Sequence, residues 1–195
     1  HEELFNKQQL IEAFSVERIG KSGSKFDINK AKWFNQEYLK QRSNTDLAAH
    51  LQAELSKEGK SIEGKKLEKI ASLLKERITF LKDLSKEASY FFESPAKYDD
   101  QVIATKWNEE VQIVAEEWKG VLQSLAPFDA DNIKHSFHEL LEKKGIKIGK
   151  VMQAIRVAIT GLGQGPDLMQ IIEIIGKEEA IARLEKAIKV LPIKV

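Results

Sequence analysis

The chain has 195 residues, which is enough for one large or two small domains with a proper hydrophobic core. Apolar residues make up 42% and charged residues 31%, as in ordinary globular proteins, and the formal net charge is +1. The overall charge therefore gives no case for a nucleic-acid partner, and the absence of cysteine excludes disulfides and thiolate metal sites. No apolar run approaches the ~20 residues of a membrane span, so no membrane partner is expected. The polar N-terminal segment HEELFNKQQL has no signal-peptide pattern.

The first part of the chain carries helical patterns separated by polar loops. Asp27 is expected to cap a helix, because its side-chain oxygen can accept hydrogen bonds from the free N–H groups of the first turn. The following helix has leucines at a spacing of four residues, and we expect its cap at Thr45 or Asp46. The repeating leucines of that helix are Leu47, Leu51 and Leu55.

A long continuous helix is predicted from about Lys65 to Ser85, because its apolar residues recur on a single face. Arg77 lies at the margin of that face, between the buried and the solvated side. The segments Ser94-Pro95 and Tyr98–Asp100 have the composition of a connection between helical units. We therefore place a domain boundary near residue 100.

The second half of the chain is also helical in pattern. Val102–Leu125 predicts either one long helix or a broken pair, and Asp131 is expected to cap a helix that Gly145 ends. No alternating strand pattern longer than a few residues occurs in the sequence. The predicted fold class is therefore all-α, with two packed helical units. Trp33, Trp107 and Trp118 are interpreted as core residues.

The stretch Gly149–Leu168 predicts a helix, a glycine-bracketed turn and the start of a second helix. Gly161 follows the last periodic residue, where a chain that leaves a helix often needs a positive φ. Pro166 and Asp167 suit the start of the next helix, because proline has no N–H to lose there and an acid faces the positive helix end. Arg156 lies at the edge of the apolar stripe of the first helix.

The charges are unevenly distributed along the chain. Residues 102–131 have a balance of −4, whereas residues 132–195 have a balance of +4. This asymmetry can present one basic face although the total charge is nearly neutral. The basic residues closest to Arg156 in the sequence are Lys143, Lys144, Lys147 and Lys150.

No pattern of acid–base, nucleophilic or metal chemistry stands out. His135 and His138 are three residues apart and could share a helix face as a metal pair, but no HExxH-type arrangement accompanies them. The GLGQG run at 161–165 lacks both the preceding strand and the Lys-Ser/Thr of a phosphate loop, so we interpret it as a turn between helices. The residues alone indicate a chain that binds or positions a partner.

Three stretches resemble the C-terminal portion of bacterial glutamyl-tRNA synthetases, a class I aminoacyl-tRNA synthetase family. FDINKAKWFNQEYL (Phe26–Leu39) is similar to the tRNA-stem-contact region, and LLKERITFLKDL (Leu73–Leu84) to a helix of the first anticodon-binding subdomain. GIKIGKVMQAIRVAITG and the residues that follow it (Gly145–Ile188) are similar to the closing subdomain. The resemblance implies a stem-contact end at 1–41 and two helical anticodon-binding subdomains at 42–100 and 101–195.

The resemblance implies a function without catalysis by this chain. The His-x-Gly-His-type motif and the Lys-x-Ser-Lys loop with which the family binds ATP do not occur here, so the adenylate-forming site, with its ATP and Mg²⁺, is expected upstream of His1. The chain itself is expected to hold no catalytic residue, no metal and no cofactor. Its expected partner is the tRNA for glutamate, and the parent enzyme is expected to be a cytoplasmic monomer.

Single residues match the anticodon-reading positions of the family. Arg77 matches the arginine associated with preferring the glutamate over the glutamine anticodon, and Arg156 matches the arginine of the closing motif. Leu168 matches a hydrophobic residue after the proline, where it could give a base an apolar wall. Gly165 stands where some relatives have a threonine, and His138 where some carry a basic contact residue.

Phosphate contacts position an RNA without reading its sequence, and exposed lysines are suited to them. The lysines that we predict to contact the tRNA backbone are Lys21, Lys25, Lys144, Lys147 and Lys150. A different class of function is also compatible with the residues. Near-neutral net charge and many amphipathic helices are typical of a helical protein-interaction scaffold with no RNA partner.

Overall fold

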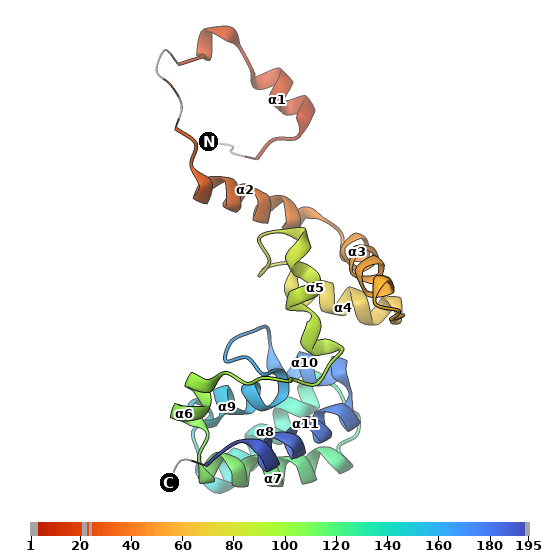
Figure 1. Cartoon of the computed structure of the whole chain (residues 1–195), viewed down its shortest axis with the longest axis vertical. Coiled ribbons are helices and arrows are strands. Elements are labelled where there is room, and N and C mark those ends of the chain that lie inside the picture. The colour runs from red at the N-terminus through yellow and green to blue at the C-terminus, as the bar shows by residue number, and fades with distance from the viewer. Residues whose placement is uncertain (1–3, 21–22, 24, 194–195) are drawn as a thin grey trace.

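The computed structural model describes residues 4–20, 23 and 25–193, and all regular secondary structure in these residues is helical. This confirms the predicted all-α class. The molecule is elongated, with α1 at one end and the C-terminal helices packed together at the other (Figure 1). Within the described ranges, no helix has both the length and the hydropathy that a membrane span requires.

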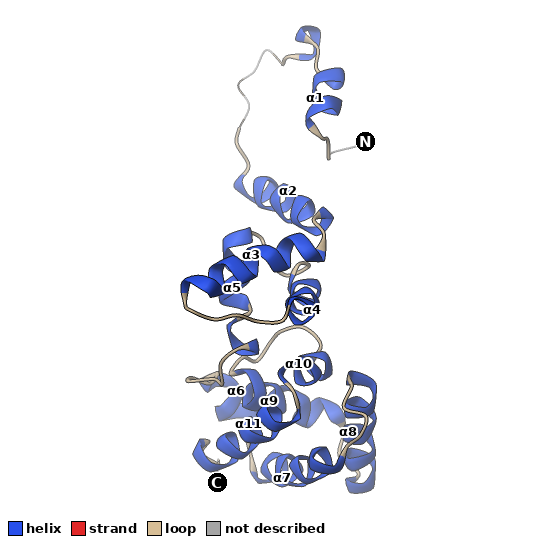
Figure 2. Cartoon of the chain, turned by 90° about the vertical axis from the view of Figure 1, so that its right-hand side faces the viewer, coloured by secondary structure: helices blue, strands red, loops and turns tan. Residues whose placement is uncertain are grey.

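The helices fall into two groups along the long axis of the molecule (Figures 1 and 2). The N-terminal elements are α1 (Lys7–Ala13), η1 (Val16–Arg18), α2 (Ile28–Gln41), α3 (Asn44–Lys57), α4 (Gly64–Leu74), η2 (Leu81–Asp83), α5 (Leu84–Glu87) and η3 (Ser89–Phe91), where η denotes a 3₁₀ turn. The C-terminal elements are α6 (Asp100–Lys106), α7 (Glu109–Ser124), α8 (Ala130–Lys144), α9 (Ile148–Thr160), α10 (Leu168–Ile175) and α11 (Lys177–Val190).

Two helix caps lie earlier than the sequence pattern predicts. The cap of α3 is Ser43, whose hydroxyl accepts from the N–H of Asp46 at 3.0 Å, so the predicted caps Thr45 and Asp46 are wrong. The cap of α8 is Asp129, not Asp131. Several polar residues that can cap a helix stand close together at the start of α3. Ser43 comes first and accepts from a backbone N–H three residues ahead, so Asp46 supplies that N–H and is not the cap itself. The cap of α2 is Asp27, as predicted.

The predicted helix Lys65–Ser85 is wrong, because α4 ends at Leu74. The chain then makes a turn and continues as η2 and α5. Carbonyl groups of that turn are bonded from outside: the Gln36 side chain on α2 donates to the carbonyl of Glu76 at 3.0 Å, and Asn35 donates to that of Thr79. The turn therefore loses helical bonds but gains tertiary ones, which local periodicity cannot reveal.

The stretch Val102–Leu125 is the broken pair that the sequence left open. Helix α6 ends at Lys106, and Asn108 caps α7 by accepting from the N–H of Val111 at 3.0 Å. Trp107, at the break, is 2% exposed and fills the core between the two helices.

The C-terminal helices bury a continuous apolar core. Trp118 on α7 packs against Phe137 on α8 with ring centroids 4.5 Å apart, and its indole N–H donates to the Ser136 hydroxyl at 3.2 Å. The predictions for Trp107 and Trp118 are thus confirmed. Trp33 on α2 is 39% exposed, so its assignment to the core is wrong. Helix α2 carries only one buried residue, Leu39, because few described elements pack against it.

A buried arginine joins the two groups of helices. Arg183 on α11 is 1% exposed, and its Nη1 donates to the carbonyl of Tyr90 on η3 at 2.6 Å and to that of Ile159 on α9 at 3.0 Å. Its Nε donates to Glu179 on the same helix at 2.7 Å. One guanidinium therefore satisfies carbonyls from both groups and fixes η3 against the end of α9.

We expect Arg183→Met to lower the free energy of unfolding by about 2–4 kcal/mol, because two buried carbonyl oxygens then lose their donor. Urea unfolding measures this change. Lys189→Met on the same helix is the matched control, since Lys189 also pairs with a glutamate four residues away but is exposed. The control is expected to stay within about 0.5 kcal/mol of the parent chain. Equal losses in the two variants would contradict the role of Arg183.

Candidate nucleic-acid interface

Arg77 lies in the turn that follows α4, and its side chain is exposed. The backbone of this turn is fixed by the bond from Arg77 N–H to the Leu74 carbonyl at 2.8 Å and by the donors from α2 described above. Arg77 forms no ion pair with another residue of the described ranges. The guanidinium group of Arg77, carried on a fixed backbone, is thus available to a partner.

Arg156 lies on α9, and its side chain is half-buried. Its Nη1 atom is shielded from solvent and has no hydrogen-bond partner in the described part of the chain. Nη1 lies 3.0 Å from the position that a Cβ atom on Gly165 would occupy, so the turn between α9 and α10 covers it closely. A side chain at position 165 would therefore require the Arg156 guanidinium to shift.

The two arginines come from different groups of helices and still share one environment. Burial lowers the pKa of Arg156, the interactions with Tyr90 and Asp167 oppose that shift, and the positive charge of Arg77 adds to it. The charge of Arg77 is therefore one of the influences on the Arg156 guanidinium.

Tyr90 on η3 belongs to the same environment, and sequence reasoning missed it. Its side chain is 6% exposed, and its hydroxyl has no hydrogen-bond partner among the described residues. Burial raises the pKa of the Tyr90 phenol, Glu87 adds to the rise, and Arg156 and Arg77 oppose it. The tyrosine stands directly before Phe91 and Phe92 in the sequence, so no local signal distinguishes it from a core aromatic residue.

The glycine-bracketed turn between α9 and α10 is present as predicted, but Pro166 and Asp167 lie before the first turn of α10, which begins at Leu168. Gly161 ends α9 with φ +80°, and its carbonyl accepts from the N–H of Asp99 at 2.9 Å. A Cβ atom on Gly161 would stand 2.6 Å from the carbonyl oxygen of Lys97. Asp167 caps α10 by accepting from the N–H groups of Met169 and Gln170 at 2.9 and 3.0 Å. The turn is therefore held at both ends, beside Arg156.

Leu168 does not line the surface. It is 2% exposed and belongs to the core beneath α10, so in this structure its side chain offers no apolar wall to a nucleotide. The periodicity of α10 explains this position, because Leu168, Ile171, Ile172 and Ile175 form its buried face.

The predicted phosphate-binding lysines differ in their surroundings. Lys147 and Lys150 are exposed at the start of α9, and Lys25 is exposed before α2, whereas Lys21 lies outside the described residues. Lys144 bonds Glu117 at 2.7 Å and shares a hollow with Glu109 and Glu110. Because these acids compensate its charge, Lys144 is the least suited of the group to bind a phosphate.

The histidine pair is not assembled into a metal site. His135 pairs with Glu139 at 3.4 Å, and among the residues that the structure describes no group of three or more His, Cys, Asp or Glu side chains could hold a metal ion. His138 is half-buried on α8.

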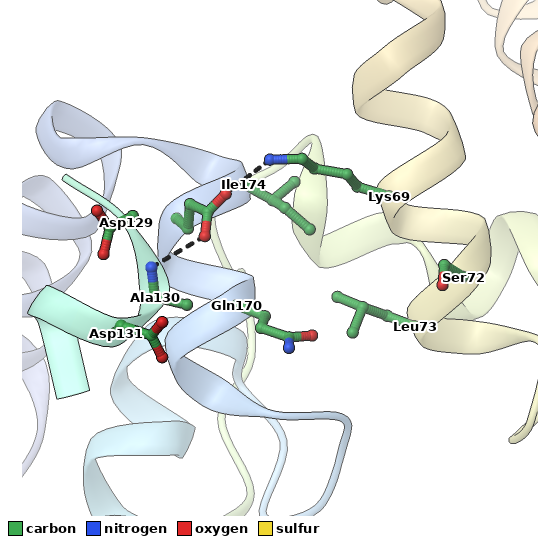
Figure 3. A pocket seen from close by; sticks show the side chains of 9 residues that line it. Lys69, Ser72, Leu73, Asp129, Ala130, Asp131, Gln170 and Ile174 are labelled. Carbon is green, nitrogen blue, oxygen red and sulfur yellow. Dashed lines mark hydrogen bonds and ion pairs between the residues drawn. The ribbon is translucent and has the colours of Figure 1, made fainter. Parts of the chain in front are cut away.

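A groove of about 380 Å³ separates α4 from α8 and α10 on the side of Lys69 (Figure 3). Lys69 reaches across it and pairs with Glu173 at 2.7 Å, and Glu173 also accepts from the N–H of Ala130 at 2.9 Å. The hydrogen bond from Lys69 lowers the pKa of Glu173. Asp129 and Asp131 make this groove acidic, so it is the wrong surface for an RNA backbone.

Known proteins similar to this chain identify its family. Residues 45–188 match the family model described as an anticodon binding domain. The chain belongs to this family. It is 52% identical over its whole length to the glutamate–tRNA ligase of Cytophaga hutchinsonii and 43% identical over 97% of its length to that of Amoebophilus asiaticus. It spans only 38% and 37% of the lengths of these relatives.

Solved structures agree with this family assignment. A crystal structure of a glutamate tRNA ligase from Elizabethkingia meningosepticum superimposes with a TM-score of 0.88 at 37% identity and covers 95% of this chain and 37% of that one. The glutamate-tRNA synthetase of Elizabethkingia anophelis gives a TM-score of 0.83, also at 37% identity, over 94% of this chain and 36% of that one. The resemblance to the C-terminal portion of bacterial glutamyl-tRNA synthetases is thus confirmed.

We expect Gly161→Ala to lower the free energy of unfolding by about 2–4 kcal/mol, because the methyl group combines an unfavourable φ with a clash against the Lys97 carbonyl. Thermal unfolding with calorimetry measures this loss. Gly149→Ala is the control: it lies in α9 with open space around it, and is expected to be neutral or to add up to about 1 kcal/mol. A Gly161 variant as stable as the parent chain would show that the turn is not fixed as described.

Proposed function

We propose that the chain is the tRNA-binding, anticodon-recognising part of a glutamate–tRNA ligase, and that its partner is the tRNA for glutamate. The observation that carries this proposal is the match of residues 45–188 to the anticodon binding domain family, within which Arg77 is exposed without an ion pair among the described residues and Arg156 has a buried Nη1 atom without a hydrogen-bond partner there. Anticodon bases are unpaired and can be stacked and hydrogen-bonded on their pairing edges. A planar guanidinium does both, whereas a lysine is only a point charge.

In this proposal the chain selects the tRNA and does not perform the reaction. The sequence lacks the family's ATP-binding motifs, so the remaining part of such a ligase would attach glutamate with ATP and Mg²⁺. We place the protein in the cytoplasm, which is supported by the absence of cysteine. Each base contact of this kind contributes about 1–3 kcal/mol, so two arginines are enough for strong discrimination between anticodons.

One observation favours the alternative of a protein-interaction scaffold. The segment from α1 to α2 exposes large apolar side chains, among them Phe14, Val16 and Phe26 at 67%, 70% and 77%. Contiguous exposed apolar surface is typical of a protein interface. Titration of the chain with the tRNA for glutamate at low salt separates the two functions, because a scaffold would leave the tRNA free.

We expect Arg77→Gln to narrow the preference of the chain for the glutamate over the glutamine anticodon by about tenfold, because the neutral amide loses the bidentate, charged contact. The measurement is the ratio of the dissociation constants for the two anticodon stem–loops, which differ in one base. Lys57→Gln, exposed at the far end of α3, is expected to leave this ratio unchanged. An unaltered ratio in the Arg77 variant would remove Arg77 from base reading.

We expect the double change Lys147→Ala and Lys150→Ala to weaken binding of all tRNAs alike and to reduce the slope of log K against log salt concentration by about 2, one unit per lost phosphate contact. Binding measured between low and moderate salt gives this slope. Lys144→Ala is the comparison, because Glu117 already compensates that charge, and its slope is expected to stay near the parent value. Parallel slopes for the double variant and the parent would place these lysines outside the footprint.

A further inference from the structure

A single ion pair joins α4 to α10 across the groove on the Lys69 side (Figure 3). Lys69 Nζ lies 2.7 Å from Glu173 Oε1, and in the described part of the chain no other hydrogen bond or ion pair connects these two helices. Glu173 also accepts from the N–H of Ala130, so its carboxylate is held by α8 as well. The side chain of Lys69 is 63% exposed and that of Glu173 is 26% exposed. The carboxylate is therefore fixed in place, and the cation reaches it from a mostly solvated side chain.

Other polar contacts between the two groups of helices lie along the segment that connects them, residues 90–99. Besides the bond from Arg183 described above, Lys186 donates to the carbonyl of Pro95 at 2.7 Å, and the N–H of Asp99 donates to the carbonyl of Gly161 at 2.9 Å. The connecting segment is thus tied to α9 and α11 by several bonds, whereas α4 has one polar contact across the groove. This arrangement is that of a hinge at residues 90–99, with the ion pair limiting how far the groove opens.

The two helices that the ion pair joins lead directly to the two candidate anticodon-reading arginines. Helix α4 ends at Leu74, and the N–H of Arg77 donates back to the Leu74 carbonyl at 2.8 Å, so Arg77 follows any movement of α4. Helix α10 begins at Leu168, directly after the turn in which Gly165 lies against Arg156 Nη1. A change in the separation of α4 and α10 therefore changes the separation of the two arginines.

We infer, on the basis of the proposed function, that the Lys69–Glu173 ion pair positions Arg77 relative to Arg156 and thereby sets the selectivity with which the chain binds an anticodon. Lys69 and Glu173 are positioning residues, because they act through the angle between the two groups of helices and do not contact a base themselves. Selectivity requires a fixed geometry, since hydrogen bonds to a base edge weaken steeply away from their preferred distance and angle.

The charges along the groove make Lys69 a positioning residue and not a phosphate contact. Among the described residues that line the groove, Lys69 is the one cation, and the carboxylates are Asp129, Asp131 and Glu173. These carboxylates repel a phosphate, so an RNA backbone has no reason to approach Lys69. Exposed ion pairs contribute little to overall stability, so loss of this pair is expected to change the angle between the groups without unfolding either of them.

Distances between the two groups test the role of the pair without RNA. The chain has no cysteine, so Lys57→Cys on α3 and Lys134→Cys on α8 provide two exposed attachment points for spin labels. We expect Lys69→Met and Glu173→Gln each to broaden the distribution of distances between the labels. Glutamine keeps an acceptor oxygen for the N–H of Ala130, so the start of α8 is retained in that variant. Distributions identical to that of the parent chain in both variants would overturn the inference.

Anticodon selectivity tests the functional consequence, measured as the ratio of the dissociation constants for the glutamate and the glutamine anticodon stem–loops. We expect Lys69→Met and Glu173→Gln each to reduce the preference by about 2- to 5-fold, the range that loss of an exposed ion pair allows. The unfolding temperature is expected to shift by no more than about 3 °C. The double variant should lose no more preference than either single variant, since both changes remove the same pair. Lys69→Arg keeps the charge and is expected to retain the parent preference.

Lys65→Met is the matched control, because Lys65 is exposed on the same helix and forms no ion pair with another described residue. It is expected to keep the parent preference. Equal weakening of both stem–loops by Lys69→Met, with tighter binding of both by Glu173→Gln, would show that the charges act directly on the phosphates and would overturn the inference. If the parent chain binds neither stem–loop, or binds both equally, the proposed function itself fails. If the parent discriminates between them and both variants do so equally well, only the role of the ion pair fails.

Discussion

The guanidinium of Arg183 is the contact on which the arrangement of this protein depends. It is buried between the two groups of helices, and it bonds one carbonyl from each of them. A buried arginine is unfavourable unless its donors are used, and here the carbonyls and Glu179 use them. The bond fixes η3 against the end of α9, and Arg156 lies three positions before Ile159 on that helix.

The candidate nucleic-acid interface therefore takes residues from both groups of helices and depends on the contact between the two groups. Arg77 is supplied by the turn after α4 and Arg156 by α9. The exposed ion pair of Lys69 with Glu173 and the bond of Lys186 to the Pro95 carbonyl at 2.7 Å support the same junction from other sides. Hydrogen-bond donors that the fold already holds in place lose little conformational freedom when they bind a base. Such donors favour selectivity between bases more than affinity alone.

The charge distribution of the molecule is compatible with the selective recognition of RNA bases that we propose. A net charge of +1 gives little general attraction for RNA, and the groove on the Lys69 side is acidic. In the proposed function, the exposed lysines at the start of α9 would position a backbone, while the buried Arg156 Nη1 near Gly165 would read the base. The proposal thus assigns affinity and specificity to different parts of α9.

The sequence by itself determined the all-α class and the ends of several helices, and its resemblance to a family singled out Arg77 and Arg156. Apolar residues at a spacing of three and four define helices, and Gly161 and Asp27 act through their own backbone and side chain, so local chemistry suffices. Only the tertiary structure decided that α4 stops at Leu74 and that the Tyr90 carbonyl accepts from Arg183. Each of these depends on contacts between residues distant in the chain, such as the 93-position separation of Tyr90 and Arg183, and no local pattern encodes such a contact.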